Sequence, residues 1–293
     1  MVSSLLSVFS WSESLSFLEQ VAQVVGFTVT HAERDVDDFL ISGYEHLLCI
    51  DTTRNRRLAD AAHPLGVFRY QTFSPADYDR FLHQYIRTDL QWAMLDFGKP
   101  GLERVACESS LWTPTVRSMW YRATLDGGEA TVELSLPERA TTLYGAPGTL
   151  FVTISLEGRL MKFDVNWRDK PAVRLPEACW FSFSPLVSGS ADWEMKKLAQ
   201  TVSPLDVVPN GNRHLHAVDG TISCTDQDIG LFLETWDAPL VAPGEPSLLN
   251  FHNDQPRVEK GMHFNLYNNV WGTNFPLWFG EPARFRFDFR ISP

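Results

Sequence analysis

The sequence predicts a mainly β protein, folded as a large antiparallel sandwich. From residue 112 onward, short segments rich in Phe, Val and Thr alternate with turns marked by Gly, Pro, Asn and Asp, which is typical of all-β domains. Residues 284–290 read Arg-Phe-Arg-Phe-Asp-Phe-Arg, and this alternation predicts a strand with one buried face and one face in water. The aromatic content of 13%, with 20 Phe and 10 Trp, is high and typical of all-β proteins with aromatic-lined clefts.

The first part of the chain is expected to hold one or two short helices. Apolar residues recur at helical spacing over residues 14–25, and Gly26 would end that helix. Residues 39–50 are expected to form two short strands around Gly43, followed by a turn at residues 52–57.

The clearest local signal is a helix start at Ser74. Its side chain can cap the helix, Pro75 suits the first helical position, and Asp77 favours the positive end of the helix dipole. We expect this helix to run to about Arg87 and residues 92–101 to be mostly loop.

The rest of the chain is expected to consist of short strands. No internal repeat or low-complexity linker interrupts them. Residues 36–293 are therefore predicted to form one β domain, after a segment at residues 1–35 that remains unassigned. The expected strands are residues 67–72, 118–125, 130–136, 149–156, 160–167, 178–184, 194–198, 214–218, 220–224, 230–236, 247–251, 262–267 and 284–291.

Charge and hydropathy restrict the partners. The formal net charge of −11 repels phosphate backbones, and the sequence has no basic stripe that could bind them. We therefore expect neither nucleic acid nor an anionic membrane as a partner. The chain has no run of about 18 apolar residues, and its first residues lack the Lys or Arg of a secretory signal. A cytoplasmic location is expected, and a homodimer or a separate catalytic chain stays open.

The four cysteines show no spacing that is typical of zinc or redox sites. Cys49, Cys107, Cys179 and Cys224 lie far apart in the sequence, each among apolar neighbours. Buried thiols are expected, while two disulfides stay open.

The strongest candidate for a binding site is a tract of amide and aromatic residues at positions 261–278. His263, Asn265 and Tyr267 share one face of an expected strand. Neutral amides, indoles and phenols suit a neutral polar ligand better than a phosphate. A ligand cleft or an internal polar network would satisfy these groups. The expected ligand-binding residues of the tract are Asn265, Tyr267, Asn268, Asn269, Trp271, Thr273 and Asn274, and His263 is a candidate for proton transfer.

A second candidate is the pair His214 and His216, which would share one side of a strand. Such a pair can hold a metal only with further ligands, for which His263, Asp219 and Asp226 are candidates. A hydrogen-bonded or exposed pair is the favoured interpretation, and a role in proton transfer beside a ligand stays open. We expect no metal and no cofactor.

Two carboxylates are further candidates for acid–base chemistry. Glu177 precedes a strand that contains Trp180, a possible ligand contact, so its pKa could be raised. Pairing with Arg174 is the structural alternative for Glu177. Asp96 and Lys99 lie in an aromatic loop, where a local salt bridge is the alternative to a site.

Several well-defined enzyme motifs are missing from the sequence. It has no Gly-x-Ser-x-Gly elbow, no phosphate-binding Gly loop and no His-Glu-x-x-His. Carboxylate chemistry stays open, because paired acids leave no linear motif.

Several ordered motifs together resemble one family. Over about residues 40–293 the chain looks like a fungal and bacterial family, domain of unknown function 5054, which is similar to the α-mannosidase type of retaining glycoside hydrolases. The motifs are His63-Pro64-Leu65-Gly66, Tyr70-Gln71-Thr72-Phe73, Asp96-Phe97-Gly98-Lys99-Pro100-Gly101, Lys170-Pro171-Ala172-Val173-Arg174-Leu175-Pro176-Glu177-Ala178, Asn210-Gly211-Asn212-Arg213, His216-Ala217-Val218 and the stretch from His263 to Pro276.

The resemblance implies a β-supersandwich like the C-terminal half of those enzymes, related to the galactose-mutarotase type of fold. It also implies an upstream α/β domain, which in the mannosidase relatives holds the nucleophilic aspartate and the zinc site. We expect this chain to start after that domain, so the glycosidase mechanism is not expected to carry over.

Three functions are compatible with these observations. The chain would bind a sugar-like or polycyclic small molecule in an aromatic cleft without hydrolysing it. Alternatively, it would be a repurposed cyclase, isomerase or lyase that uses the His and carboxylate candidates. In the third hypothesis it is the accessory subunit of a glycosidase.

Overall fold

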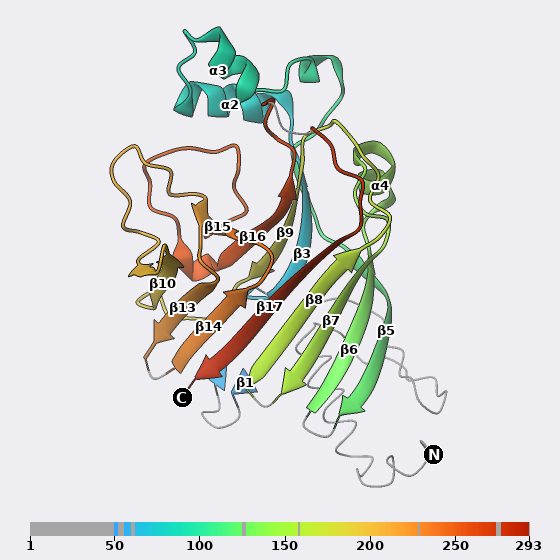
Figure 1. Ribbon diagram of the computed structural model, residues 1–293, viewed down its shortest axis with the longest axis vertical. Coiled ribbons are helices and arrows are strands. Elements are labelled where there is room, and N and C mark those ends of the chain that lie inside the picture. Colours follow the sequence, from blue (N-terminus) through green and yellow to red (C-terminus); the bar gives the residue numbers. More distant parts are fainter. Residues whose placement is uncertain are drawn as a thin grey trace.

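The computed structural model describes residues 50–51, 56–59, 62–124, 127–157, 159–227, 229–273 and 277–292. The expected helix at residues 14–25 and nearly all of the expected strands at residues 39–50 lie outside these ranges. The described part is a sandwich of two antiparallel sheets, as the sequence predicts (Figure 1).

The larger sheet has nine strands and forms one layer of the sandwich. Its strands pair antiparallel along the whole sheet. In spatial order they are β11 (Gln200–Val202), β10 (Asp192–Lys197), β13 (Thr221–Asp226), β14 (Ile229–Thr235), β17 (Ala283–Ser292), β8 (Leu160–Trp167), β7 (Leu150–Glu157), β6 (Gly127–Ser135) and β5 (Thr115–Thr124).

The smaller sheet has six strands and lies behind the first in Figure 1. A separate pair, β1 (Ile50–Asp51) and β2 (Arg56–Arg57), completes the described strands. The spatial order of the six is β12 (His216–Ala217), β15 (Leu240–Pro243), β16 (Met262–Asn268), β9 (Glu177–Phe183), β3 (Leu65–Thr72) and β4 (Ser110–Trp112).

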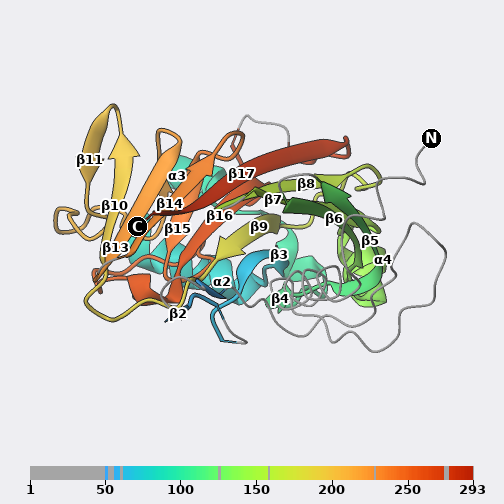
Figure 2. The ribbon, with the colours of Figure 1, turned by 90° about the horizontal axis from the view of Figure 1, so that it is seen from below.

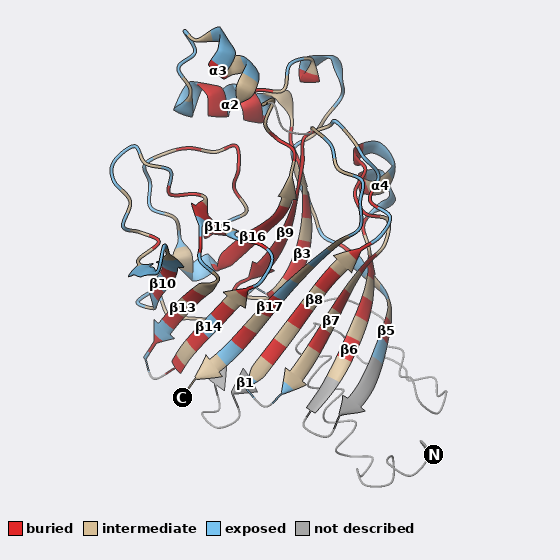
Figure 3. Cartoon of the chain, in the orientation of Figure 1, coloured by how far each residue is buried: buried red, intermediate tan, exposed pale blue. Residues whose placement is uncertain are grey.

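The main core lies between the two sheets and is built from alternate residues of their strands. β8 alternates between buried and half-buried residues along its whole length, a pattern that Figure 3 shows as stripes. Phe181 and Phe264 of the smaller sheet meet Phe287 of β17 with ring centroids 5.2 and 5.1 Å apart. Such aromatic contacts join the two layers into one core.

The outer faces of the two sheets differ. Every residue of β9 is buried, because a second apolar cluster covers the outer face of the smaller sheet. That cluster includes Trp180, Leu249 and Phe251 together with Phe81 of a helix. The outward side chains of β8 and β17 are instead half-buried or exposed, so this face of the larger sheet is in contact with solvent.

The helices lie at the margins of the sandwich. The helix predicted from Ser74 is confirmed as α2 (Pro75–Tyr85), and Figure 1 shows it beyond the ends of β3, β9 and β16. The segment expected as loop contains a short helix, α3 (Gln91–Asp96), and a 3-10 turn, η1 (Leu102–Arg104). Two further elements were not predicted, α4 (Glu138–Tyr144) and η2 (Val258–Lys260).

Most strand predictions are confirmed, with three kinds of difference. The strand expected at residues 247–251 is absent from the described structure, and that expected at residues 214–218 shrinks to β12. The short strands β4, β11 and β15 were missed. The three missed strands have too few residues for an alternating pattern. Whether such a segment forms a strand depends on the strands beside it, which the sequence does not reveal.

Candidate functional site

The imidazole of His263 is buried in the smaller sheet, away from solvent. It is 2% exposed, and its Nδ1 lies 2.8 Å from Ser182 Oγ on the neighbouring strand. Burial, reinforced by Arg69, lowers the pKa of His263 to about 3, against an opposing hydrogen bond with the Gly244 backbone. His263 is therefore a neutral side chain at neutral pH.

The carboxamides of the tract mainly tie the chain to itself. Asn265 Nδ2 donates to the Tyr267 carbonyl at 3.3 Å, and its Oδ1 accepts from Asn268 Nδ2 at 2.7 Å. Asn269 Oδ1 accepts the backbone N–H of Glu177 at 2.8 Å. Its Nδ2 lies within hydrogen-bond distance of the carbonyls of Val173, Leu175 and Leu277.

The loop after β16 packs against the helical end of the molecule. The Trp271 ring lies 5.5 Å from that of Phe81 in α2 and 6.0 Å from that of Phe97. Within the described residues, Thr273 Oγ1 is buried without a hydrogen-bond partner. Asn274 lies outside the described residues.

Asp96 and Lys99 are brought against this loop, although not as a local salt bridge. The Asp96 carbonyl accepts the backbone N–H of Gly272 at 2.9 Å, and Lys99 Nζ donates to the Asn269 carbonyl. Burial lowers the pKa of Lys99 to about 8, with Glu177 opposing this shift. Lys99 also lines a pocket of about 200 Å³ between α2 and residues 94–103.

Glu177 lies at the centre of a fully buried polar network. Lys170 Nζ is 2.6 Å from its Oε1, and the Tyr70 hydroxyl donates to its Oε2 at 2.6 Å. Burial raises the pKa of Glu177 to about 7, while Lys170, Tyr70 and Lys99 limit the rise. Lys170, not Arg174, is thus the partner of this carboxylate, and Arg174 instead covers the Trp278 ring at 4.3 Å.

Two aromatic candidates flank this network in different ways. Trp180 is fully buried on the opposite face of β9, where its Nε1 donates to Gln71 Oε1 at 2.9 Å. Tyr267 is half-buried, and its hydroxyl is buried beside Glu177. Burial and the nearby Glu177 raise the pKa of Tyr267 above its ordinary value.

The two histidines His214 and His216 lie apart from the tract and have separate partners. His214 Nε2 is 3.1 Å from the His252 carbonyl, and burial lowers its pKa. His216 Nδ1 is 3.2 Å from Lys197 Nζ, and Nε2 is 3.2 Å from the Arg213 carbonyl. Burial and Lys197 lower the pKa of His216 to about 4. Nδ1 then accepts from Lys197 while Nε2–H donates to the carbonyl.

The predicted residues thus fall into three groups. Asp96, Lys99, Glu177, Tyr267 and residues 268–271 meet at one end of the sandwich. A second group lies within the smaller sheet (His263, Asn265 and Trp180), and the pair His214 and His216 forms the third. No cluster of three His, Cys, Asp or Glu side chains that could hold a metal occurs among the described residues.

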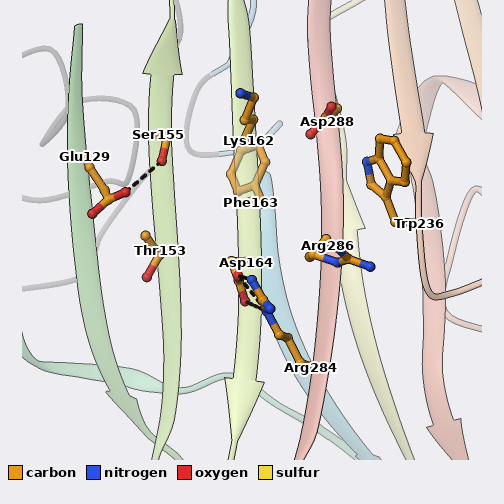
Figure 4. Close-up of a pocket in the computed structure, with 10 residues that line it drawn as sticks. All are labelled: Glu129, Thr153, Ser155, Lys162, Phe163, Asp164, Trp236, Arg284, Arg286 and Asp288. Atoms are coloured by element: carbon orange, nitrogen blue, oxygen red, sulfur yellow. Dashed lines mark hydrogen bonds and ion pairs between the residues drawn. The ribbon is translucent and has the colours of Figure 1, made fainter. Parts of the chain in front are cut away.

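A site that the sequence reasoning missed lies on the solvent-facing side of the larger sheet. It is a groove of about 460 Å³ that crosses β6, β7, β8 and β17, with Trp236 at one side (Figure 4). Its volume is within the range of small-molecule sites. The groove is lined by Glu129, Thr153, Ser155, Lys162, Phe163, Asp164, Trp236, Arg284, Arg286 and Asp288.

The register of the strands places the polar side chains of the groove in two rows. Residues directly opposite one another on neighbouring strands share a face of the sheet, with side chains in contact distance. One row, here called the outer row, is Glu129, Ser155, Lys162 and Asp288. The next, here called the central row, is Thr153, Asp164 and Arg286, and it continues beyond the groove lining to Thr131 on β6.

Ion pairs within the groove hold its charged groups in fixed positions. Arg284 binds Asp164 through two nitrogens, and Arg286 binds Asp237 through two contacts of 2.9 Å. The hydrogen bond from Arg286 holds the pKa of Asp237 below its ordinary value. Three acidic and three basic side chains line the groove, so its charges balance. No hydrogen bond or ion pair joins Asp288 to the other lining residues drawn in Figure 4.

Trp236 contributes the only indole of the groove lining and is 57% exposed. It follows β14 directly, and its backbone N–H donates to the Arg286 carbonyl at 3.1 Å. The indole adds a flat apolar surface to an otherwise mostly polar lining. The alternation at residues 284–290 did predict a solvent-facing row. It could not predict the strands beside it, since these come from residues 129–164.

Residues 33–161 match the family model described as Domain of unknown function (DUF5054), which confirms the resemblance over that part of the chain. No curated protein matches the sequence. Among the described residues, no helix is long and apolar enough to cross a membrane.

The structure is similar to several solved ones at low sequence identity. An alpha-mannosidase from Enterococcus faecalis V583 is 8% identical, with a TM-score of 0.49 over 89% of this chain and 30% of that chain. A Glycosyl Hydrolase Family 38 protein from Enterococcus faecalis is 9% identical, with a TM-score of 0.45 and the same coverages. The chain therefore spans 30% of the length of these two proteins. A galactose 1-epimerase from Lactobacillus acidophilus NCFM is 10% identical, with a TM-score of 0.44 over 89% of this chain and 92% of that chain.

Proposed function

We propose that this protein binds a neutral, polyhydroxylated ligand of the sugar class in the groove of the larger sheet. The observation that carries the proposal is the exposed indole of Trp236 beside two rows of hydrogen-bonding side chains. An indole offers a flat apolar surface, and a sugar ring offers a face of C–H groups that can pack on it.

The charges of the groove support a neutral ligand over an ionic one. Asp164 and Arg286 are each satisfied by an ion pair with another protein side chain, and the acidic and basic side chains of the lining balance, so the lining carries no net charge that would attract an ion. Each guanidinium keeps further N–H groups, and each carboxylate keeps further lone pairs, for ligand hydroxyls. The carboxylate of Asp288 and the hydroxyl of Ser155 add acceptors in the outer row.

Exposure of an indole does not by itself mark a site, since Trp92 is 60% exposed away from the groove; what distinguishes Trp236 is that it borders a groove of hydrogen-bonding groups. Solvated faces carry Lys, Glu and Thr because these cost little in water, whereas a solvent-facing Trp loses the gain of burial. Its position against the row of hydroxyl and ionic groups therefore favours a binding role.

The test is saccharide binding by the full chain and by Trp236→Ala. A panel of neutral saccharides is titrated by calorimetry or tryptophan fluorescence. We expect the substitution to weaken binding by about tenfold or more, which corresponds to about 1.4 kcal/mol. The matched control is Trp92→Ala, because Trp92 is 60% exposed on α3, away from the groove. Equal affinity of the wild type and Trp236→Ala, or the same loss in both variants, would contradict the proposal.

Proton transfer on a small polar substrate is a second candidate function, favoured by the position of Lys99. Its amine lines the pocket beside α2, contacts the tract at Asn269 and has a pKa lowered to about 8. Such an amine exchanges its proton near neutral pH. Of the nearby charges, the buried Glu177 raises the pKa of this amine and Arg174 lowers it. An NMR titration that returns an ordinary lysine pKa of about 10.4 for Lys99 would remove this candidate.

A further inference from the structure

The central row of the groove does not end at Thr131. On the neighbouring strand β5, Trp120 is the direct cross-strand partner of Thr131. Met119 is fully buried in the core, so Trp120 points to the opposite, solvent-facing side. The indole is 38% exposed, although it lies within a regular strand where apolar side chains usually face inward.

A second exposed indole thus stands at the far end of the same row. From end to end, the row reads Trp120, Thr131, Thr153, Asp164, Arg286 and Trp236. Adjacent strands are about 4.8 Å apart, so its five steps span about 24 Å. Such a span is several times the width of one sugar ring.

The side chains between the two indoles are polar and already oriented. Thr131 Oγ1 and Thr153 Oγ1 lie 3.0 Å apart and are hydrogen-bonded to each other. Asp164 is held by Arg284, and Arg286 is held by Asp237. These contacts already restrict the rotamers of the side chains. Binding of a ligand along the row therefore costs less side-chain conformational entropy.

We propose that the ligand is an extended neutral oligosaccharide, which lies across the strands from Trp236 to Trp120. This inference rests on the proposed function, since it names the class of sugar that the same groove binds. The indoles stack the two end rings, and the hydroxyl and ionic groups of the central row contact the hydroxyls between them. A protein partner fits this surface less well, because interface centres are depleted in charged residues and rich in contiguous apolar contacts.

The test measures how affinity depends on the length of the sugar. Neutral homo-oligosaccharides of several linkage types, from the monosaccharide to the hexasaccharide, are titrated into the full chain and two variants. We expect affinity to rise by about tenfold or more from the short to the long members. Trp120→Ala should lower the affinity for the hexasaccharide by about tenfold and leave that for the monosaccharide unchanged.

Phe232→Ala serves as the matched control. Phe232 is 42% exposed on the same face of the sheet but pairs with Arg290, outside the central row. This control should bind all lengths as the wild type does. A loss of hexasaccharide affinity in Phe232→Ala equal to that in Trp120→Ala would overturn the inference.

The outcomes separate this inference from the function on which it rests. If saccharides bind and depend on Trp236, but affinity is independent of length and of Trp120, the extended ligand is wrong while the proposed function stands. Absence of any saccharide binding overturns both. A change in sedimentation of Trp120→Ala and Trp236→Ala, without any effect of sugars, would identify the row as a contact between protein chains and likewise overturn both.

Discussion

Glu177 illustrates how the surroundings of one residue decide its chemistry. Its place near Trp180 predicted a raised pKa, and burial does raise it to about 7. The physical cause differs from the expected one, because Trp180 lies on the other face of β9. The carboxylate instead faces Lys170, seven positions earlier in the chain, and Tyr70, which the neighbouring strand β3 brings to it. Desolvation of the two charges offsets much of their attraction, so a buried pair of this kind adds little net stability.

His263 leads to a prediction about acid sensitivity. With a folded-state pKa of about 3 against an ordinary value of 6.5, the folded protein does not take up this proton until far below the pH at which the unfolded chain does. Neutral His263 therefore makes its full contribution to the free energy of unfolding above pH 6.5, and this contribution is lost as the pH falls from 6.5 toward about 3. The slope is about 1.4 kcal/mol per pH unit for one proton.

The measurement is the free energy of unfolding as a function of pH for the wild type and for His263→Gln. Glutamine cannot titrate and can keep a hydrogen bond to Ser182, so the curve of this variant should be flatter by about one proton between pH 6.5 and 3. His83→Gln, on the exposed side of α2, is the control. Identical slopes for the wild type and His263→Gln would contradict the neutral assignment of His263.

At the scale of elements, α2 begins where its sequence predicts and connects the helical end to the tract. Asp77 Oδ2 accepts the backbone N–H of Ser74 at 2.7 Å and its hydroxyl at 2.9 Å. Burial raises the pKa of Asp77, but these hydrogen bonds outweigh it and hold the pKa below its ordinary value. Tyr78 follows Asp77 in α2, and its hydroxyl donates to the Val270 carbonyl at 2.6 Å.

Asp77→Ala should therefore destabilise both the helix and the loop that follows β16. Loss of a negative charge from the first turn of a helix costs about 0.3–1 kcal/mol. Loss of the ion pair with Arg80, which also donates to the Leu249 carbonyl, adds to that cost. Hydrogen exchange should become faster at residues 78–86 and at residues 269–272. Asp79→Ala, an exposed acid of the same helix, should change neither segment, and an equal effect in that variant would argue against a capping role.

The strands differ in how far their own residues predict them. Long strands with one solvent-facing side, such as β8 and β17, show an alternating pattern of polar and apolar residues in the sequence. β9 is buried on both faces and lacks alternation, so only its apolar, aromatic composition indicated a strand. Short elements such as α3 and β15 have too few residues for any period to appear.

At the scale of the whole molecule, one core joins the two sheets. Phe287 of the larger sheet and Phe264 of the smaller one are fully buried in the same cluster. We therefore expect residues 36–293 to unfold as one cooperative unit, as predicted for a single domain.

Substitution in either sheet tests this expectation. Phe287→Ala and Phe264→Ala should each lower the free energy of unfolding by about 3–5 kcal/mol, with coincident transitions by far-UV circular dichroism and tryptophan fluorescence. Phe232→Ala, on the solvent-facing side, should change stability by less than about 0.5 kcal/mol. Two separate transitions, of which only one moves with each substitution, would show that the sheets are independent units.

The sequence by itself determined the fold class, the start of α2 and the solvent-facing side of β17. These depend on local periodicity and capping, which neighbouring residues along the chain encode. Only the tertiary structure decided which polar residues meet. It buried the amides of the tract in contacts with main-chain carbonyls, separated His214 from His263, and aligned Trp236 with side chains from four other strands. The reason is that cross-strand register pairs residues more than a hundred positions apart, and no local pattern carries that information.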